Sequence, residues 1–482
     1  MARQTVAPTA WMQLLLVCKL WKKIACDIAE LWRVIYVNSN PNWLQLCLNR
    51  AARSLIDLHL ANVWAGDIQA AKHLILPHKH RIRAIRIHDS HNRLTTSIVD
   101  LLTIGLTTLQ ELSFVPVEWR VKREVSLGLS PQAFPRIQSL TLSGISLPRD
   151  PSFYRNIRYL ELHEQCCKSN GFTIRHLFDA LRAASPSLED LDLSRFDPIQ
   201  EERPVEHPQF HLTSLRSFCM DNSFRLASQI VKALLIPPRI HLRLRIVLAE
   251  GEAMEHQTTE RLFAAIVPSN IRVALDQAEE LAVLVERERF RVRVLDKAPS
   301  PDPRDRGGLH SERVRIELHG SYFPAEALRA VPVVCAAPLT TLCINSPDIQ
   351  HDISDWRLAF DAFPLLENLV LHGREVGWLG SIGIPFTALT KEAEMGPGRA
   401  VEAGSKSGAS CPLLKAVRVE GLSPRALLEG QESRRFFSIV ALCLYSRKGH
   451  ARKLDKLTLR SFLRDEDSKE LEGWVGKVEI IS

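Results

Sequence analysis

The chain has 482 residues, of which 45% are hydrophobic and 24% charged, so it can bury a large core and is neither a disordered nor a collagen-like chain. The formal net charge of +7 is small for this length and argues against a nucleic-acid-binding protein. The ten cysteines include no Cys-x-x-Cys pair and no cluster with histidines at zinc spacing, so we expect free thiols in the cytoplasm and/or nucleus, with no metal and no cofactor.

An amphipathic helix is expected near the N-terminus. Its apolar residues at helical spacing are Leu14, Val17, Trp21, Ile24 and Ile28. Lys19, Lys22 and Lys23 lie off this face. The apolar run from Leu14 to Cys18 is too short to span a membrane, so no membrane partner is expected. From periodicity alone, this helix could simply cap the elements that follow it.

A pattern of the form L-x-x-L-x-L, with aliphatic substitutes, recurs through the rest of the chain. Its eleven clear copies begin at Leu55, Ile82, Leu109, Ile137, Ile157, Leu188, Leu215, Leu339, Leu366, Leu414 and Leu454. The last two apolar positions of each copy are two residues apart, which is the period of a strand. Looser copies lie around 242–246 and 314–318.

Helical spacing of apolar residues follows many of these strands. The predicted helices cover 67–76, 95–105, 173–184, 225–236, 354–363 and 432–448. A strand plus a helix every 25 to 30 residues predicts an α/β leucine-rich-repeat solenoid, a horseshoe with a parallel concave sheet and outer helices. The alternative is a doubly wound α/β enzyme, whose strands are buried on both faces. Polar residues between the apolar strand positions, such as Asp190 and Asp192, favour the solenoid.

The repeat divides the chain into segments. Residues 37–248 form a first array and 313–482 a second array. The period is lost over 249–312, which we expect to be irregular or mobile, with a loop over 296–308 (DKAPSPDPRDRGG). The Gly-rich stretch 377–410 reads as a loop inserted into the second array.

Residues 1–36 resemble a known motif. Val17, Cys18, Lys19 and Trp21, then Ile24, Ala25, Leu31 and Trp32, are similar to the second half of an F-box, whose pattern is V-C-[KR]-x-W followed by L-W. The strand and helix expected over 34–60 resemble the segment by which many fungal F-box proteins pass into leucine-rich repeats. The first F-box helix, of the type L-P-x-E-[LI]-L, has no counterpart in residues 1–13, so the N-terminal half of the motif is missing.

The resemblance implies a substrate-recognition adaptor of a Skp/cullin/F-box ubiquitin ligase. Matching positions imply that the Skp-type adaptor contacts Leu14, Leu15, Val17, Cys18, Trp21 and Trp32. Each of these side chains could equally belong to the core. Because half of the motif is missing, the alternative is a leucine-rich-repeat scaffold for protein interactions whose degenerate F-box no longer binds the adaptor.

Charged residues on the open strand face suggest how a protein substrate binds. The middle repeats present acidic residues at Glu161, Asp190, Asp192 and Asp221. The end repeats present basic residues at Arg86, Arg418, Lys456 and Arg460. We therefore expect a partner with a basic segment near Asp190 and Asp192. The sequence contains no P-loop, G-x-G-x-x-G, H-E-x-x-H or G-x-S-x-G motif, so we expect no enzymatic activity.

Overall fold

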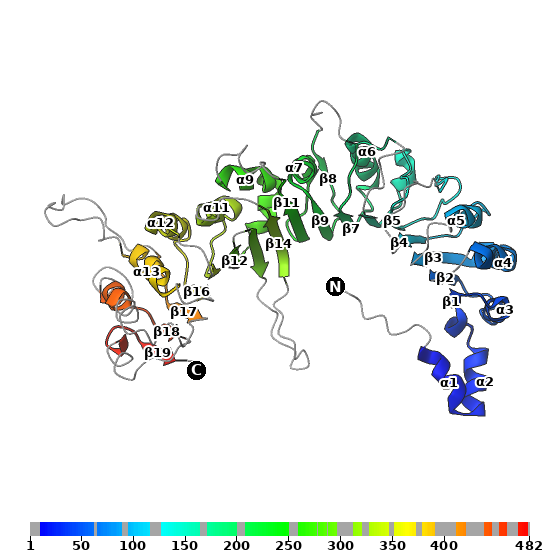
Figure 1. Cartoon of the computed structure of the whole chain (residues 1–482), viewed down its shortest axis with the longest axis horizontal. Coiled ribbons are helices and arrows are strands. Elements are labelled where there is room, and N and C mark those ends of the chain that lie inside the picture. The colour runs from blue at the N-terminus through cyan, green and yellow to red at the C-terminus, as the bar shows by residue number, and fades with distance from the viewer. Residues whose placement is uncertain are drawn as a thin grey trace. The chain divides into compact units, whose positions relative to one another are not determined.

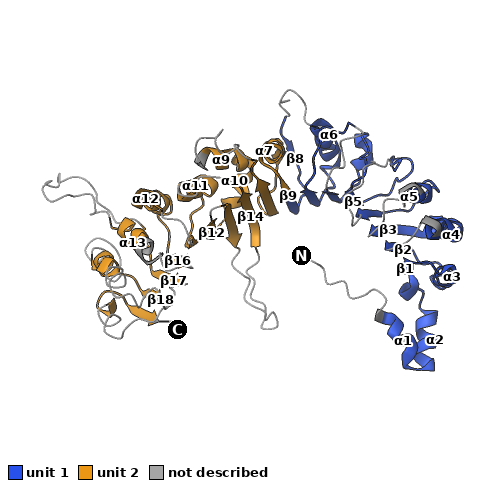
Figure 2. Cartoon of the chain, in the orientation of Figure 1, with its two compact units in different colours: residues 1–219 blue, residues 220–482 orange. Residues whose placement is uncertain are grey.

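A computed structural model of the chain divides it into two compact units, Met1–Cys219 and Met220–Ser482 (Figure 2). The structure describes residues 10–61, 65–88, 95–115, 127–163, 171–199, 208–249, 259–276, 278–286, 288–295, 312–320, 327–346, 351–372, 378–390, 411–420, 438–445, 453–459 and 471–480. Both units combine mostly parallel strands with helices. The mixed α/β class expected from the sequence is confirmed.

Seven strands of the first unit pair in parallel and in chain order. They are β1 (Val34–Val37), β2 (Ile56–Ala61), β3 (Ile82–His88), β4 (Glu111–Val115), β5 (Ser139–Ser143), β6 (Tyr159–His163) and β7 (Asp190–Ser194). The short strand β8 (Phe210–His211) follows, and the border between the units falls within β9 (Ser217–Ser223). The strands predicted from the repeat in this unit are therefore confirmed.

The register of these strands explains the repeat. The second apolar residue of each copy pairs with its counterpart on the next strand, and these partners are Leu58, Ile85, Leu112, Leu140, Leu160 and Leu191. All six side chains are at most 1% exposed. The second apolar residues of successive copies thus form one buried row across the strands. Each unit of the repeat thereby completes the core of its neighbour.

In the first unit, four of the described helices precede β1, and the α-helices that follow the strands lie on one side of them (Figure 1). The helices are η1 (Ala10–Gln13), α1 (Leu14–Val17), α2 (Lys19–Asp27), η2 (Ala29–Trp32), α3 (Pro41–Arg50), α4 (Ala65–Ile75), η3 (Leu76–Arg81), α5 (Thr95–Leu102), η5 (Pro151–Tyr154) and α6 (Ile174–Ala184). In α6, Thr173 and His176 form a capping box, while Leu177, Phe178 and Leu181 are buried. The amphipathic spacing of this segment predicted that packing.

The second unit has a more complex sheet. Its strands after β9 are β10 (Leu234–Leu235), β11 (His241–Val247), β12 (Glu280–Glu286), β13 (Arg289–Leu295), β14 (Glu312–His319), β15 (Thr341–Asn345), β16 (Asn368–His372), β17 (Ala416–Glu420), β18 (Lys456–Leu459) and β19 (Lys477–Ile480). The helices are α7 (Phe224–Ala233), α9 (Thr259–Ile266), α10 (Ser269–Leu275), α11 (Ala327–Val334), α12 (Ile353–Ala362) and α13 (Trp378–Ala388), and residues 438–445 are also helical. From β15 to β19 the strands pair in parallel and in chain order.

The expectation that 249–312 is irregular is wrong for most of its described residues. This segment forms α9, α10, β12 and β13, and the pairing order is β11–β14–β13–β12–β15. β13 is antiparallel to both of its neighbours, whereas β14 is parallel to β11 and β12 is parallel to β15. β13 alternates apolar residues with arginines as β11 does, but it lacks the leading leucine of the repeated motif, so the sequence did not single it out. The loop expected at 296–308 lies outside the described residues.

The loop expected over 377–410 is likewise wrong at its start, because α13 is a helix despite containing Pro385. Burial of Phe386 and Leu389 accompanies this helix, so packing overrides the low helix propensity of its glycines and proline. Residues 391–410 lie outside the described part of the chain.

Alternate positions of the strands are buried, as the sequence predicted for a sheet with one open face. Burial alternates along β7, β11, β15 and β16. Asp57, which lies between the apolar positions Ile56 and Leu58 of β2, is an exception because only 2% of it is exposed. The Arg83 guanidinium covers it and donates hydrogen bonds of 2.9 and 2.5 Å to its two carboxylate oxygens.

Candidate functional site

The N-terminal segment forms two short helices rather than the single helix expected. Cys18 separates α1 from α2 with an extended backbone (φ −162°, ψ 170°). Its Sγ atom accepts a hydrogen bond from the Trp21 backbone N–H at 3.5 Å, so the thiol caps the start of α2. This cap changes the direction of the chain and therefore the face that α1 presents.

These two helices expose large apolar side chains to solvent. The exposed residues are Leu16, Val17, Leu20, Trp21, Ile24 and Ile28, and we call them the N-terminal apolar surface. Their exposed fractions run from 40% for Ile28 to 87% for Leu16. A surface helix of a folded protein normally turns its apolar face inward, yet Ala25 is the buried residue of α2. Large exposed apolar side chains gathered on two short helices point to a contact with another molecule.

Two of the six sequence-predicted adaptor contacts, Val17 and Trp21, belong to this surface. Val17, Cys18 and Trp21 are exposed and Leu15 is half-buried. The side chain of Leu14 lies outside the described part of the structure. Sequence reasoning did not select Leu16, Leu20, Ile24 or Ile28 as contacts, although the helical spacing that placed Ile24 and Ile28 beside Trp21 was the signal that could have found them.

Trp32 has a different role, because only 3% of it is exposed. Its indole Nε1 donates a 2.8 Å hydrogen bond to the Ala25 carbonyl. Trp11 and Trp43 pack against the ring with centroid separations of 4.9 and 6.0 Å. The Arg50 guanidinium lies 5.9 Å from the same ring. Trp32 is therefore a core residue that fastens α2 to α3, and its expected direct contact with an adaptor is withdrawn.

The acidic residues expected at the middle repeats divide between the two units. In the first unit Glu161 and Asp192 face each other as register partners on β6 and β7. Asp190 has a raised pKa, because burial and the negative charges of Glu189 and Glu161 outweigh its hydrogen bond with Ser217. These three carboxylates form an acidic cluster on the open face. Asp221 belongs to the second unit.

The expected contrast with basic ends is wrong, because carboxylates neutralise the cations concerned. Arg86 donates hydrogen bonds of 2.5 and 2.6 Å to Glu111. Lys456 pairs with Glu479 at 2.5 Å, and Arg418 pairs with Glu420. Asp221 is likewise compensated, since its carboxylate lies 3.2 Å from Arg245. Arg460 lies outside the described residues.

Neither metal binding nor membrane insertion has a candidate in the described ranges. No group of three or more His, Cys, Asp or Glu side chains there could hold a metal ion. None of the helices described is long and apolar enough to cross a bilayer. The cysteines in these ranges are free thiols. Burial raises the pKa of Cys47 and of Cys343 to about 12, which keeps both thiols protonated and unreactive at neutral pH.

Comparison with known proteins adds no relative. No protein-family model matches the chain, and no curated protein matches it. The features of the chain that bear on its function are therefore the N-terminal apolar surface and the open faces of the strands.

Proposed function

We propose that the chain is a non-catalytic substrate-recognition adaptor of a Skp/cullin/F-box ubiquitin ligase. In this proposal the helices up to residue 36 bind a Skp-type adaptor, and a leucine-rich-repeat solenoid presents a protein substrate. The exposed N-terminal apolar surface is the observation that carries the proposal. Such a ligase would work in the cytoplasm and/or nucleus, and the free thiols of the described residues fit a reducing compartment.

The composition of the N-terminal apolar surface suits a protein partner. Trp21 is 47% exposed and lies among exposed aliphatic residues, and large aromatic side chains contribute most of the binding energy in many interfaces. Lys19, Lys22 and Lys23 on the same helix α2 are also exposed and add positive charge to it. Apolar contact would supply the affinity, while the lysines would orient an acidic partner.

The solenoid part of the proposal rests on the strands. In both units, strands at the repeated motif pair in parallel and keep one face open. The acidic cluster of Glu161, Asp190 and Asp192 lies on that face in the first unit. Like charges opposite each other on neighbouring strands are unfavourable, so a basic segment of a substrate would relieve their repulsion.

Co-purification tests the adaptor proposal. The tagged chain should retain a purified Skp-type adaptor, and the double variant Leu20→Glu with Trp21→Ala should lose it. Leu358→Glu is the matched control, since Leu358 is an exposed leucine (53%) on α12 in the other unit. Retention by all three proteins, or by none, contradicts the proposed contact. No retention by the wild type would favour the alternative, a repeat scaffold with a degenerate F-box.

The substrate surface needs its own experiment. Reversing Asp190 and Asp192 to lysine should remove basic partners from the set of proteins that co-purify with the chain, and adaptor binding should not change. An unchanged partner set would refute the acidic docking surface without affecting the adaptor proposal.

A further inference from the structure

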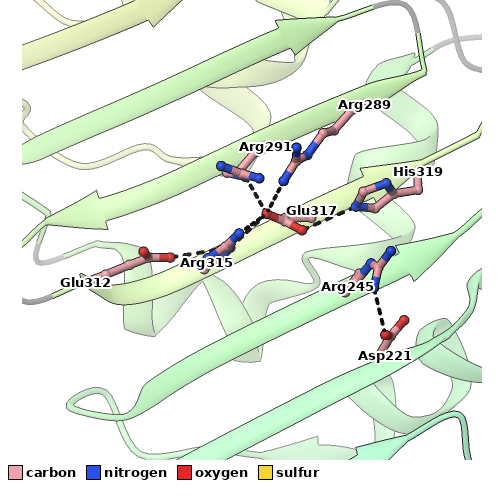
Figure 3. A network of polar contacts seen from close by, with 8 residues as sticks. All are labelled: Asp221, Arg245, Arg289, Arg291, Glu312, Arg315, Glu317 and His319. Atoms are coloured by element: carbon pink, nitrogen blue, oxygen red, sulfur yellow. Dashed lines mark hydrogen bonds and ion pairs between the residues drawn. The ribbon is translucent and has the colours of Figure 1, made fainter. Parts of the chain in front are cut away.

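The open face of β11, β13 and β14 in the second unit carries a concentration of arginines (Figure 3). We call this set the arginine face, and it consists of Arg243, Arg245, Arg289, Arg291, Arg293 and Arg315. These three strands contain no lysine. The planar guanidinium of arginine can bind a carboxylate or phosphate through two parallel hydrogen bonds, which the lysine ammonium cannot do. The presence of arginine and the absence of lysine on these three strands therefore indicate anion recognition.

One buried carboxylate organises the centre of the arginine face. Glu317 has a side chain that is 5% exposed, and it contacts Arg315 at 2.5 Å, Arg289 at 3.2 Å and also Arg291. His319 lies 3.2 Å from its second oxygen. Figure 3 shows the three guanidiniums converging on this carboxylate. A single negative charge cannot neutralise three guanidiniums, so positive charge remains here even though Glu312 lies 3.6 Å from Arg315.

A row of three like charges crosses the same face. Arg243, Arg315 and Arg293 are direct register partners on β11, β14 and β13. Among the residues that the structure describes, no carboxylate pairs with Arg243 or Arg293. Neighbouring strands lie about 4.8 Å apart, so this arrangement is repulsive in the free protein. An anion bound across the row would reduce that repulsion and would pair with Arg243 and Arg293, although Arg315 already contacts Glu317.

The continuation of this row is apolar. Arg293 faces Ala282 on β12, Ala282 faces Cys343 on β15, and Cys343 faces Val370 on β16. Burial raises the pKa of Cys343 to about 12, so its thiol stays neutral and behaves as a small apolar group. The sheet therefore changes from cationic to apolar along a single line across its strands.

The surroundings argue against a nucleic acid. Glu280 and Glu286, on the neighbouring strand β12, would repel a continuous line of phosphates. In the described parts of β11 to β14, no Phe, Tyr or Trp occupies an open position on which a base could stack, because Phe290 is buried. A peptide can place its few negative charges over the arginines alone.

We propose that this line is the docking site for an extended acidic peptide segment of a partner protein. Two acidic residues spaced i and i+2 would lie over Arg243, Arg315 and Arg293. An aliphatic residue about four positions further along would lie over Cys343 and Val370, and this even spacing keeps its side chain on the same side of the extended peptide as the acidic ones. The spacing follows from the sheet: Cys343 and Val370 lie two and three strand intervals from Arg293, about 10 to 14 Å, and an extended chain rises about 3.3 Å per residue. This inference goes beyond the proposed function, because it requires neither the adaptor nor the acidic cluster of the first unit.

Fluorescence anisotropy with the full chain and a labelled ten-residue peptide tests the proposal. The peptide contains two glutamates two residues apart and a leucine four residues after the second, in a Ser/Gly background. The Arg243→Glu, Arg293→Glu double variant leaves the Glu317 contacts in place, and it should weaken binding at least tenfold. The matched control is Arg225→Glu with Lys453→Glu, which changes the charge by the same amount at two exposed cations of the same unit. The control should bind like the wild type.

Three further arms make the result decisive. Replacing the leucine by serine should weaken binding, and replacing the glutamates by lysines should abolish it. An oligouridine of equal length should bind less tightly than the peptide. The proposal is overturned if the wild type does not bind the peptide, if both double variants weaken binding equally, if the leucine makes no difference, or if oligouridine binds more tightly. Unchanged thermal unfolding of the double variant would show that it is folded.

Discussion

Replacement of Glu317 by glutamine should destabilise the strands around it. The substitution keeps the size of the side chain but removes the charge that three guanidiniums share. Burial alone would raise the pKa of Glu317, but hydrogen bonds from Arg315 and His319 and the charges of Arg315 and Arg289 lower it overall. The folded state therefore favours the ionised carboxylate, and its loss removes the negative charge that Arg289, Arg291 and Arg315 share.

The size of the expected loss in the free energy of unfolding follows from how exposed the three arginine partners of Glu317 are. Removing one member of a buried ion pair costs about 3 to 5 kcal/mol. The arginine side chains are 15% to 34% exposed, so water shields part of their repulsion and the lower end, about 3 kcal/mol, applies. Because the lowered pKa stabilises the folded state above the unfolded pKa, the contribution is complete at neutral pH. It is lost as the pH falls through the folded value.

Hydrogen exchange measured peptide by peptide is the suitable assay, because it reports the local opening of β13 and β14 rather than unfolding of the whole chain. A loss of about 3 kcal/mol corresponds to exchange that is faster by about 100-fold. Glu280→Gln is the matched control, since Glu280 lies on the adjacent strand β12 and has no ion-pair partner in the described ranges. Equal exchange in the two variants would refute the central role of Glu317. A further check is Arg315→Ala, which should cost less in the Glu317→Gln background than in the wild type.

Three other substitutions or conditions test the fold. Trp32→Ala should destabilise the N-terminal helices by about 3 kcal/mol or more, seen as faster exchange in α2, and unchanged exchange would contradict its core position. Burial, followed by the charges of Arg86 and His88, lowers the pKa of His59 to about 4. The free energy of unfolding should therefore fall by up to about 3 kcal/mol as the pH drops from 6.5 to 4. The unfolding midpoint of His59→Gln should vary less over this range, and an equal variation in the variant and the wild type would contradict the lowered pKa. Gly320 has φ +114°, and a Cβ there would lie 2.9 Å from the Leu248 carbonyl oxygen. Gly320→Ala should therefore lower the free energy of unfolding, measured in urea, by about 1 to 3 kcal/mol. An unchanged unfolding midpoint would contradict the predicted backbone strain.

The repeat predicted the regular part of the fold because its cause is local. Each copy places two apolar residues on the buried face of a strand, as Leu140 and Leu142 do on β5, and this alternation is visible without a structure. β13 was not predicted, because the leading leucine of the motif is absent and Arg291 and Arg293 occupy the open face of the strand. Its place depends on pairing with β12 and β14, which is tertiary information.

The candidate site was predictable in position but not in detail. Helical spacing located the apolar face around Trp21. The burial of Trp32, in contrast, depends on its packing against Trp11 and Trp43 from other helices, which the sequence does not show. The expected basic ends were wrong for a similar reason. Arg86 is neutralised by Glu111, which comes from the next repeat, and one sequence does not show which charges meet across strands.

Hydrogen exchange of the wild-type chain, with and without a purified Skp-type adaptor, tests the central proposal most directly. The account predicts that the adaptor slows exchange in 14–28, the two helices that expose Leu16, Leu20 and Trp21, and leaves the strands of the second unit unchanged. Protection of these helices should disappear in Leu20→Glu with Trp21→Ala and persist in Leu358→Glu. Unaltered exchange over 14–28 at saturating adaptor would contradict the account.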